Sequence, residues 1–236
     1  MAQIRIEKFI ADLTGLSRNE VKAKLKKKAI KVNGIVLSKL IKIDPESDYV
    51  EVDNVVVKYE KFQYYMFNKP ANFVCANSDP NEATIFDIVG LPNKKFFSFG
   101  RLDKDTEGLL ILSNDGEMCH KLLSPKNHIP KKYYVKVDKK INSDVLLNNK
   151  PIKISDDFIV SKYELEPIDK KSCFLTIYEG KFHQVKRMFG AFGISVLYLK
   201  RVQFGNLKLD NSLKLGEIRK LSELEVELLR NEEKQA

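Results

Sequence analysis

The spacing of apolar residues predicts two helices near the start of the chain. Residues 4–13 repeat apolar side chains at i, i+3, i+4 and i+7, which is the spacing of one helical face. The residues on this face are Ile6, Phe9, Ile10 and Leu13. Gly15 ends the first helix, and Ser17 with Glu20 three residues later favours a capped second helix. We therefore expect a pair of short amphipathic helices.

Beyond the helical pair, strand patterns separated by turn residues dominate the chain. The segment KAIKVNGIVLSK predicts two short strands around Asn33 and Gly34, because both residues accept the positive φ of a tight hairpin turn. Further strands are predicted within 52–63 and at 109–113, 133–137, 159–165, 173–179 and 196–205, and helices at 117–123, 181–192 and 222–235. Strands outnumber helices and short turns join many of them, which predicts an α+β fold around a mixed, largely antiparallel sheet.

Length and composition favour two domains in a soluble protein. With 236 residues the chain exceeds one typical domain, and we place the boundary near residue 60. This gives a small domain with its connector at 1–60 and a larger domain at 61–236. Hydrophobic residues make up 43% of the chain, yet no apolar run is long enough for a bilayer span. The first residues also lack the apolar core of a secretory signal, so we expect a cytoplasmic protein without a membrane partner.

The cysteines and histidines show no pattern typical of a disulfide framework or a metal site. Cys75, Cys119 and Cys173 are odd in number and lie far apart, without a C-x-x-C pair. The three histidines have no ligand spacing such as H-E-x-x-H. We therefore expect reduced thiols, no metal and no cofactor.

Positive charge is concentrated near the N-terminus. The formal net charge is +9, and residues 1–42 alone hold eleven Lys or Arg against three acidic residues. Residues 44–60 then hold six acidic residues against one Lys, so the excess belongs to one surface and not to a whole basic domain. Such a surface predicts an anionic partner, for instance a nucleic acid, with a solvated helix face as the alternative.

The same N-terminal segment resembles a known RNA-binding module. The stretches RIEKFI at 5–10, GLSR at 15–18 and IKVNG at 30–34 resemble the S4 RNA-binding domain over about residues 3–50. The resemblance implies that a helical pair presents cations to the phosphates of folded RNA. The implied RNA-binding residues are Arg5, Lys8, Arg18, Lys22, Lys26 and Lys27.

A polar loop before a predicted buried strand carries the strongest candidates for chemistry. In residues 99–116, FGRLDKDTEGLLILSNDG, a charged loop directly precedes the apolar run LLILS, and four of its charged residues are candidates for chemistry. They are Arg101, Asp103, Asp105 and Glu107. Rigid scaffolds commonly present active groups from such loops. On spacing alone, a solvated turn with one Arg–Asp pair explains these charges equally well.

This loop resembles the signature of the pseudouridine synthases that modify ribosomal RNA, in which GRLD carries the catalytic aspartate. KKYYVKV at 131–137 resembles the motif of an active-site tyrosine, and EGKFHQVKRMF at 179–189 the motif that supplies a basic partner to the aspartate. YYMFNKPANFVC at 64–75 is similar to the first strand and the Lys-Pro turn of the same domain. The resemblance spans nearly the whole chain, and its His-Gln pair is closer to the small-subunit (RsuA-type) enzymes than to their large-subunit relatives.

The resemblance implies roles for individual residues. Asp103 would be the essential carboxylate, Tyr133 would stack on the uracil, and Lys186 would keep the carboxylate charged. Arg101 would bind or replace the flipped nucleotide, unless it forms a salt bridge within its loop. The further substrate-binding residues would be Lys69, His183, Gln184 and Arg187. Asp105 and Glu107 are expected to be structural, with hydrogen bonds to the loop backbone.

Two local features refine these expectations. A helix over 181–192 would bury one apolar face consisting of Phe182, Val185, Phe189 and Phe192, with its basic residues turned to an RNA cleft. Asn72 replaces the glycine of the usual Lys-Pro-x-Gly turn. Asn tolerates left-handed geometry, so we expect the turn to be kept.

The function predicted from the sequence is isomerisation of one uridine of 16S ribosomal RNA by a monomeric enzyme, acting on RNA or on a small-subunit assembly particle. The reaction breaks the N-glycosidic bond, turns the uracil and joins its C5 to the ribose. The nearest alternative is a synthase for large-subunit ribosomal RNA, and a noncatalytic ribosome-assembly factor is another. Hydrolysis by paired carboxylates is a third, but it leaves the S4-like segment unexplained.

Overall fold

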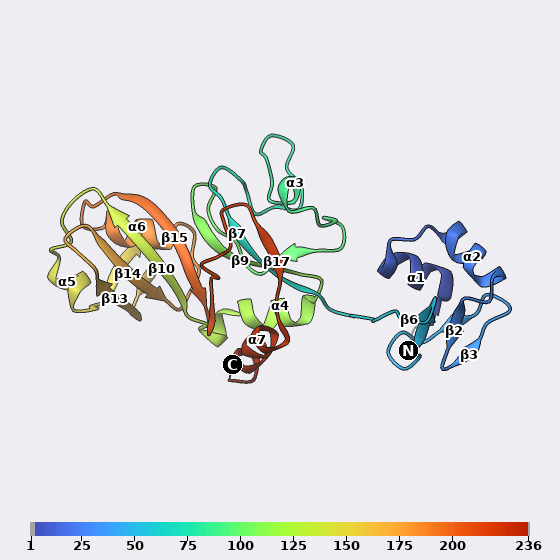
Figure 1. Cartoon of the computed structure of the whole chain (residues 1–236). Coiled ribbons are helices and arrows are strands. Elements are labelled where there is room, and N and C mark those ends of the chain that lie inside the picture. Colours follow the sequence, from blue (N-terminus) through green and yellow to red (C-terminus); the bar gives the residue numbers. More distant parts are fainter. Residues whose placement is uncertain (1–2, 236) are drawn as a thin grey trace. The chain divides into compact units, whose positions relative to one another are not determined.

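The computed structural model describes residues 3–235, and the chain divides after Lys61 into two units (Figure 1). Each unit has its own apolar core. No helix in the described part of the chain is long and apolar enough to cross a membrane.

The smaller unit packs two helices against a four-stranded antiparallel sheet. Its helices are α1 (Ile6–Thr14) and α2 (Arg18–Lys26). The sheet follows the order β3 (Ile35–Val36), β2 (Ile30–Val32), β5 (Val50–Val52) and β6 (Val55–Val56), and β1 (Ile4–Arg5) pairs separately with β4 (Lys42–Ile43). Ile6, Phe9 and Ile10 are buried in the core, which confirms the predicted face of the first helix.

The turns of the smaller unit form where the sequence predicts them. Gly15 ends α1 in the left-handed region, with φ of 75°. Ser17 and Glu20 form the predicted capping box, in which each side chain accepts a hydrogen bond from the other residue's backbone N–H. Asn33 and Gly34 both have positive φ between β2 and β3. Short-range turn chemistry therefore determines the connections of this unit.

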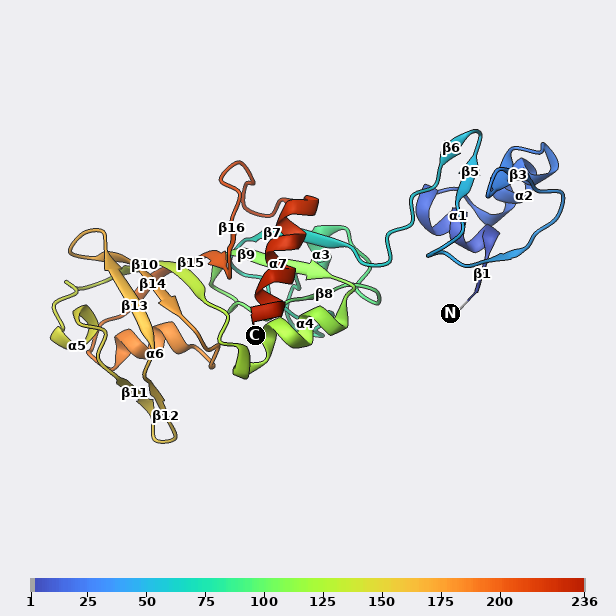
Figure 2. The ribbon, with the colours of Figure 1, turned by 90° about the horizontal axis from the view of Figure 1, so that it is seen from below.

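Within residues 62–235, one nine-stranded sheet runs through the larger unit. Its main path is β13 (Tyr163–Pro167), β14 (Ser172–Ile177), β10 (Lys131–Val137), β15 (Val196–Phe204), β9 (Glu107–Ser113), β7 (Tyr64–Lys69) and β17 (Ile218–Lys220). β16 (Leu207–Lys208) pairs antiparallel with β15, and β8 (Phe97–Ser98) pairs with β9. β11 (Ile152–Ser155) and β12 (Phe158–Val160) form a separate hairpin (Figure 2).

Helices cover different parts of this sheet (Figures 1 and 2). α6 (Gln184–Gly190) packs its apolar side on the β14, β10 and β15 part, where Val185, Met188 and Phe189 join the core. α4 (Gly116–Leu123) and α7 (Glu223–Gln235) pack on each other and on the β7 and β9 part. The shorter helices are α3 (Phe86–Val89), the 3₁₀ turn η1 (Pro125–Asn127) and α5 (Asp144–Leu147).

The two halves of the sheet meet at one short parallel contact between β9 and β15. Glu107 lies opposite Lys200, and Gly108 lies opposite Arg201, whereas the neighbouring strand pairs are antiparallel. This confirms the mixed, largely antiparallel sheet. Gly108 has φ of 103°, and a Cβ placed on it would lie 2.2 Å from the Arg201 carbonyl oxygen. A residue without a side chain is therefore required where the halves join.

The apolar run of β9 is buried on both faces. Leu109 and Ile111 belong to the core beneath α4 and α7, whereas Leu110 and Leu112 belong to the core that contains α3. A strand covered on both sides needs a continuous apolar sequence in place of alternation, which explains the pattern of this segment.

Two predicted elements have different bounds in the structure. The predicted strand over 159–165 is interrupted, because β12 ends at Val160 and β13 begins at Tyr163. The predicted helix over 181–192 is shorter, since α6 begins at Gln184. His183 directly before it has a left-handed φ of 50°, which turns the chain away from the helical path. As a result Phe182 is not on the buried helical face, and it is 75% exposed.

Replacement of Gly108 by alanine should destabilise the larger unit. The new Cβ would clash with backbone and would hold an unfavourable positive φ, so we expect a loss of at least about 2 kcal/mol in the free energy of unfolding. Thermal and urea unfolding followed by circular dichroism would measure it.

Gly190→Ala is the matched control, because no heavy atom lies within 4 Å of the added Cβ and φ is not positive there. It should unfold like the parent chain. A Gly108→Ala variant as stable as Gly190→Ala would show that the two strands can separate without cost.

Candidate active site

The loop that contains Asp103 is held from beneath by the ammonium group of Lys69. This side chain, at the end of β7, is fully buried. Its Nζ donates to the carbonyl oxygens of Pro70 at 3.1 Å, Asp103 at 3.1 Å, Lys104 at 3.3 Å and Thr106 at 2.9 Å. Several carbonyl dipoles thus compensate the buried charge and fix the course of the loop.

The sequence suggested Lys69 as a substrate contact, and in the structure its side chain has no exposed surface. Burial lowers the pKa of its ammonium, although nearby acidic groups, including Asp103 and Asp105, oppose this shift. The neighbouring turn supports the same loop. Asn72 has a left-handed φ of 73°, as expected for the glycine position, and donates its backbone N–H to the Lys104 carbonyl at 2.7 Å.

Asp103, Asp105 and Lys186 form a charged cluster at the end of this loop. Lys186 Nζ lies 3.0 Å from Asp103 Oδ2 and 2.6 Å from Asp105 Oδ1. The side chains of Asp103 and Lys186 are 26% and 25% exposed, so the pair is partly shielded yet open to a ligand. His183 Nε2 lies 3.7 Å from the other Asp103 oxygen. The structure thus brings together the carboxylate and the cation that the sequence predicts as partners.

Asp105 and Lys186 stabilise each other in their ionised forms. Burial alone would raise the pKa of Asp105, but the hydrogen bond and positive charge of Lys186 outweigh it and lower that pKa. Burial alone would lower the pKa of Lys186, but its bonds to Asp105 and Asp103 outweigh it and raise that pKa. Lys186 is therefore a full positive charge beside Asp103 at neutral pH.

A pocket opens over this cluster. The space over it, with the open solvent at its mouth included, is about 420 Å³. Its lining combines the loop, the sheet and the start of α6: Arg101, Leu102, Asp103, Thr106, Tyr133, Ile177, Gly180, Lys181, His183, Gln184, Val185, Lys186 and Leu199. Tyr133, Ile177 and Leu199 contribute apolar surface to the same lining as the Asp103 carboxylate.

The other predicted residues occupy different positions around the pocket. Tyr133 is 7% exposed and belongs both to the core and to the pocket wall. Arg101 is exposed at the pocket and forms no ion pair with the residues described, so the salt bridge considered for its loop is not found. Gln184 is buried and bonded to Glu179, which makes it a support for the turn. Arg187 is half-buried on α6 and outside the pocket lining.

The two carboxylates expected to bind loop backbone have side-chain partners instead. Asp105 accepts from Lys186, as described above, and Glu107 accepts from the Tyr198 hydroxyl at 2.6 Å. Both contacts link the loop half of the sheet to the other half. These residues therefore tie the loop across the β9–β15 contact.

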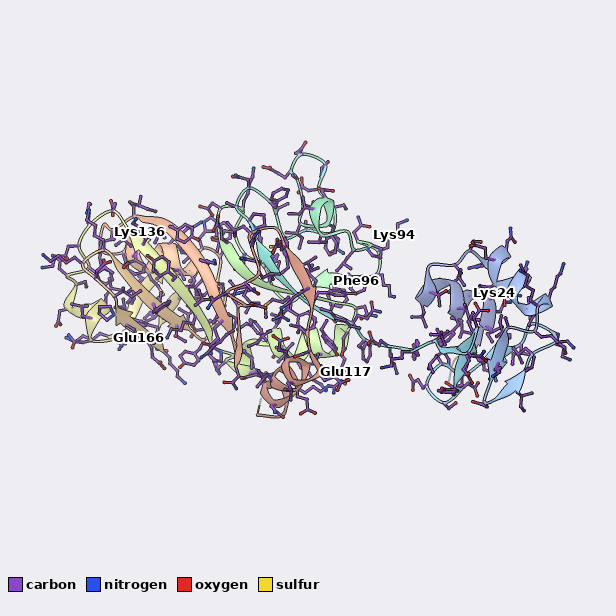
Figure 3. All side chains as sticks on the ribbon, viewed as in Figure 1. Lys24, Lys94, Phe96, Glu117, Lys136 and Glu166 are labelled. Atoms are coloured by element: carbon purple, nitrogen blue, oxygen red, sulfur yellow. The ribbon has the colours of Figure 1, made fainter. Side chains whose placement is uncertain are left out.

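The predicted RNA-binding residues of the smaller unit all have exposed side chains. Arg18, Lys22 and Lys26 follow each other at four-residue intervals on α2, which places them along one side of the helix. Lys24 differs, because it is half-buried and pairs with Asp53 (labelled in Figure 3). The cations available to an anionic partner are therefore those without a neighbouring acid.

Two cations of the sheet, one buried and one half-buried, were not predicted from the sequence. Arg201 is 2% exposed, and Lys131 donates to the Ile129 carbonyl at 2.6 Å while its ammonium lies over the Phe204 ring. Both residues stand in apolar strand patterns, so only the alternation of side chains with the core residues Tyr133 and Val135 could have indicated that Lys131 faces inward. The described residues contain no group of three or more His, Cys, Asp or Glu placed to hold a metal ion.

Comparisons with known proteins agree on one family. A family model described as RNA pseudouridylate synthase matches residues 63–191. The uncharacterized RNA pseudouridine synthase YtzG of Bacillus subtilis is 39% identical over 96% of this chain and 98% of its own length. The ribosomal small subunit pseudouridine synthase A of Haemophilus influenzae is 37% identical over 96% of this chain and 99% of its own. A crystal structure of a pseudouridylate synthase is similar with a TM-score of 0.67 at 35% identity, over 96% of this chain and 99% of that one.

Lys131 should make folding stability depend on alkaline pH. Burial, followed by the charge of Arg201, lowers its pKa from 10.5 to about 8, and Glu179 only partly opposes this. Between these values the unfolded chain holds a proton that the folded chain has lost, so raising the pH stabilises the fold. Below pH 8 the Lys131 ammonium is protonated in both the folded and the unfolded chain. The folded state then bears the full free-energy cost of burying this charge. Lys131→Met should therefore raise the melting temperature at pH 7, and this gain should shrink towards pH 10.

Lys136→Met is the control, because Lys136 is exposed on the same strand (Figure 3). Its melting temperature should follow that of the parent at every pH. A gain for Lys131→Met that is equal at pH 7 and pH 10 would contradict the proposed titration.

Proposed function

The chain belongs to the RNA pseudouridylate synthase family and is an isomerase, and from this premise we propose that it converts one uridine of 16S ribosomal RNA to pseudouridine. Relatives named as ribosomal small subunit enzymes support this target, at 37% identity for Haemophilus influenzae and 35% for Escherichia coli. Each alignment covers nearly the whole of both chains, including the smaller unit. A ribosomal substrate would place the enzyme in the cytoplasm.

The observation that carries this proposal is the carboxylate of Asp103 beside the ammonium of Lys186 in the lining of one pocket. Isomerisation needs an ionised carboxylate, which acts either as a nucleophile at the sugar or as a base on a ribose proton. A fixed positive charge at 3.0 Å stabilises the anion before reaction. Asp103 is thus the proposed catalytic residue and Lys186 its electrostatic partner.

The chemistry requires no outside reagent. The N1–C1′ bond breaks, the uracil turns, and a C5–C1′ bond forms. The proton at C5 leaves and N1 gains one, so substrate and product have the same formula. The enzyme must therefore retain the detached base, and the apolar walls formed by Ile177 and Leu199 support this retention.

Tyr133 is proposed to stack on the uracil while it turns. An aromatic face holds a base without fixing its rotation, because stacking is tolerant of orientation. The burial of Tyr133 in the sheet supports this role, since a rigid ring keeps the base plane constant. Arg101 is an exposed cation at the pocket. It is proposed either to bind the phosphate of the flipped nucleotide or to fill the space that this nucleotide leaves in the RNA.

The smaller unit is proposed to be an S4-type RNA-binding domain. Its exposed cations on α2 and its paired helices support this assignment, which separates substrate capture from chemistry. Positive groups without acidic partners release counterions from RNA and so contribute affinity that depends on salt.

The purified chain should form pseudouridine in 16S ribosomal RNA, and Asp103→Asn should nearly abolish it. The substitution keeps the side chain's size but removes its charge, so we expect a loss of at least ~10⁴-fold in single-turnover rate, or about 5.5 kcal/mol of barrier. Chemical mapping of pseudouridine in 16S and 23S RNA would measure both product and target. RNA affinity should change little.

Asp105→Asn and Glu107→Gln are the controls in the same loop. Both should retain much more activity, although Asp105→Asn removes one partner of Lys186. Equal losses in all three variants would overturn the role of Asp103. Product found only in 23S RNA would overturn the proposed target and leave the family assignment intact.

Substitution of Lys22, Lys26 and Lys27 together by glutamine should weaken RNA binding uniformly and reduce its salt dependence. Three lost phosphate contacts should lower the slope of log K against log salt concentration by about 2 to 3. Binding titrations at several salt concentrations would measure the slope.

Lys24→Gln is the control, because Lys24 already pairs with Asp53. It should change the slope less than any single substitution within the triple. An unchanged slope in the triple variant would mean that this surface is only solvated.

A further inference from the structure

One aromatic ring at the edge of the pocket is left open to solvent. Phe182 is 75% exposed, and its two neighbours in sequence, Lys181 and His183, both line the pocket. The Phe182 ring stacks on the His183 ring, with centroids 3.8 Å apart and an angle of 19° between the planes. An exposed stacked pair is thus placed directly beside the proposed reaction site.

The His183 ring lies next to the Asp103 carboxylate, and the Phe182 ring lies on the His183 ring. His183 Nε2 lies 3.7 Å from Asp103 Oδ1, and the Phe182 ring covers one face of the same imidazole. The phenyl group is therefore separated from Asp103 by a single ring. Because so much of Phe182 is exposed, a further flat group can stack on it and extend the series.

The turn that carries these rings is rigid. His183 is held in a left-handed conformation, which a side-chain-bearing residue rarely adopts. The buried Gln184 fixes this turn, because its Oε1 accepts from the Lys181 N–H at 3.0 Å and its Nε2 donates to Glu179 Oε2 at 3.1 Å. The backbone of this turn is thus held by the fold itself, and a ligand need not order it.

The surroundings favour a nucleobase as the occupant. Lys181 and Arg101 are exposed cations at the same pocket, which suits a strand of phosphates better than an apolar protein surface. An exposed ring close to a pocket lined by cations matches the arrangement by which proteins hold unpaired bases. We propose that Phe182 and His183 form a stacking platform for an unpaired base of the RNA that neighbours the target uridine.

The platform has a defined task in the reaction. A uridine that enters the pocket must leave its stack, and the adjacent base then loses a stacking partner. Phe182 replaces this partner and holds the strand while the target sugar lies against Asp103. Since every base has a π face, the platform contributes affinity without selecting one base. This inference rests on the proposed function, because it takes ribosomal RNA as the substrate.

The test is a double-mutant cycle of RNA binding, in which Phe182→Ala is combined with RNA that lacks one base. The full chain is titrated with an RNA fragment that carries the mapped target uridine, and with copies lacking the base at each flanking nucleotide. Loss of one base stack should weaken binding of the intact fragment by about 5- to 150-fold. On the fragment that lacks the stacked base, Phe182→Ala should cause no further loss. Phe182→Tyr should bind the intact fragment like the parent.

Two further measurements separate stacking from damage to the fold. The melting temperature of Phe182→Ala should equal that of the parent, because the side chain is mostly exposed. Leu224→Ala is the control for loss of an exposed apolar side chain, since Leu224 is 78% exposed on α7 and lies outside the pocket lining. It should bind RNA like the parent.

Normal binding by Phe182→Ala, or the same loss on every abasic fragment, would overturn the platform. If mapping places the product in another RNA, the proposed 16S target fails, and the same cycle is performed on a fragment of the RNA that is modified. A coupling to one flanking base would then still support the platform.

Discussion

The short parallel contact between β9 and β15 is the constraint on which the site depends. Asp103 belongs to the loop that enters β9, whereas Tyr133 and Lys186 belong to β10 and α6 on the other half of the sheet. The halves meet where Gly108 lies opposite Arg201. Because no side chain separates them there, carboxylate and ammonium can approach to 3.0 Å. Gly108 in the loop signature is thus needed for the close packing that brings Asp103 and Lys186 together.

The charges around this contact are layered. Lys69 lies beneath the loop and binds its carbonyl oxygens, so the carboxylates of Asp103 and Asp105 are left for Lys186 on the opposite side. The two cations have different partners and therefore different roles. Lys69 binds carbonyl oxygens and fixes the loop backbone, whereas Lys186 pairs with the two carboxylates. Removing Lys186 would leave the partly buried carboxylate of Asp103 without its ion-pair partner, whereas removing the more exposed Asp105 would leave the Asp103–Lys186 pair in place.

Local chemistry in the sequence was sufficient to predict many elements. The capping box at Ser17, the hairpin at Asn33 and the left-handed Asn72 follow from preferences of single residues and are confirmed. The apolar run of β9 also indicated a buried strand correctly. The partnership of Asp103 with Lys186 came from the family resemblance, since nothing in a spacing of 83 residues predicts a contact.

The features that could not be predicted from the sequence depend on backbone conformation and on contacts between residues far apart in the chain. Lys69 and Gln184 are polar residues in the family motifs, so a contact with substrate was a natural expectation, yet both are buried supports of the active-site turns. Phe182 fits a helical apolar face until the left-handed His183 moves it out of the helix. That one dihedral angle converts an expected core residue into an exposed ring beside the pocket. A turn that exposes an aromatic group close to the Asp103 carboxylate does not improve the core, and such a departure from local preference is characteristic of positions kept for binding.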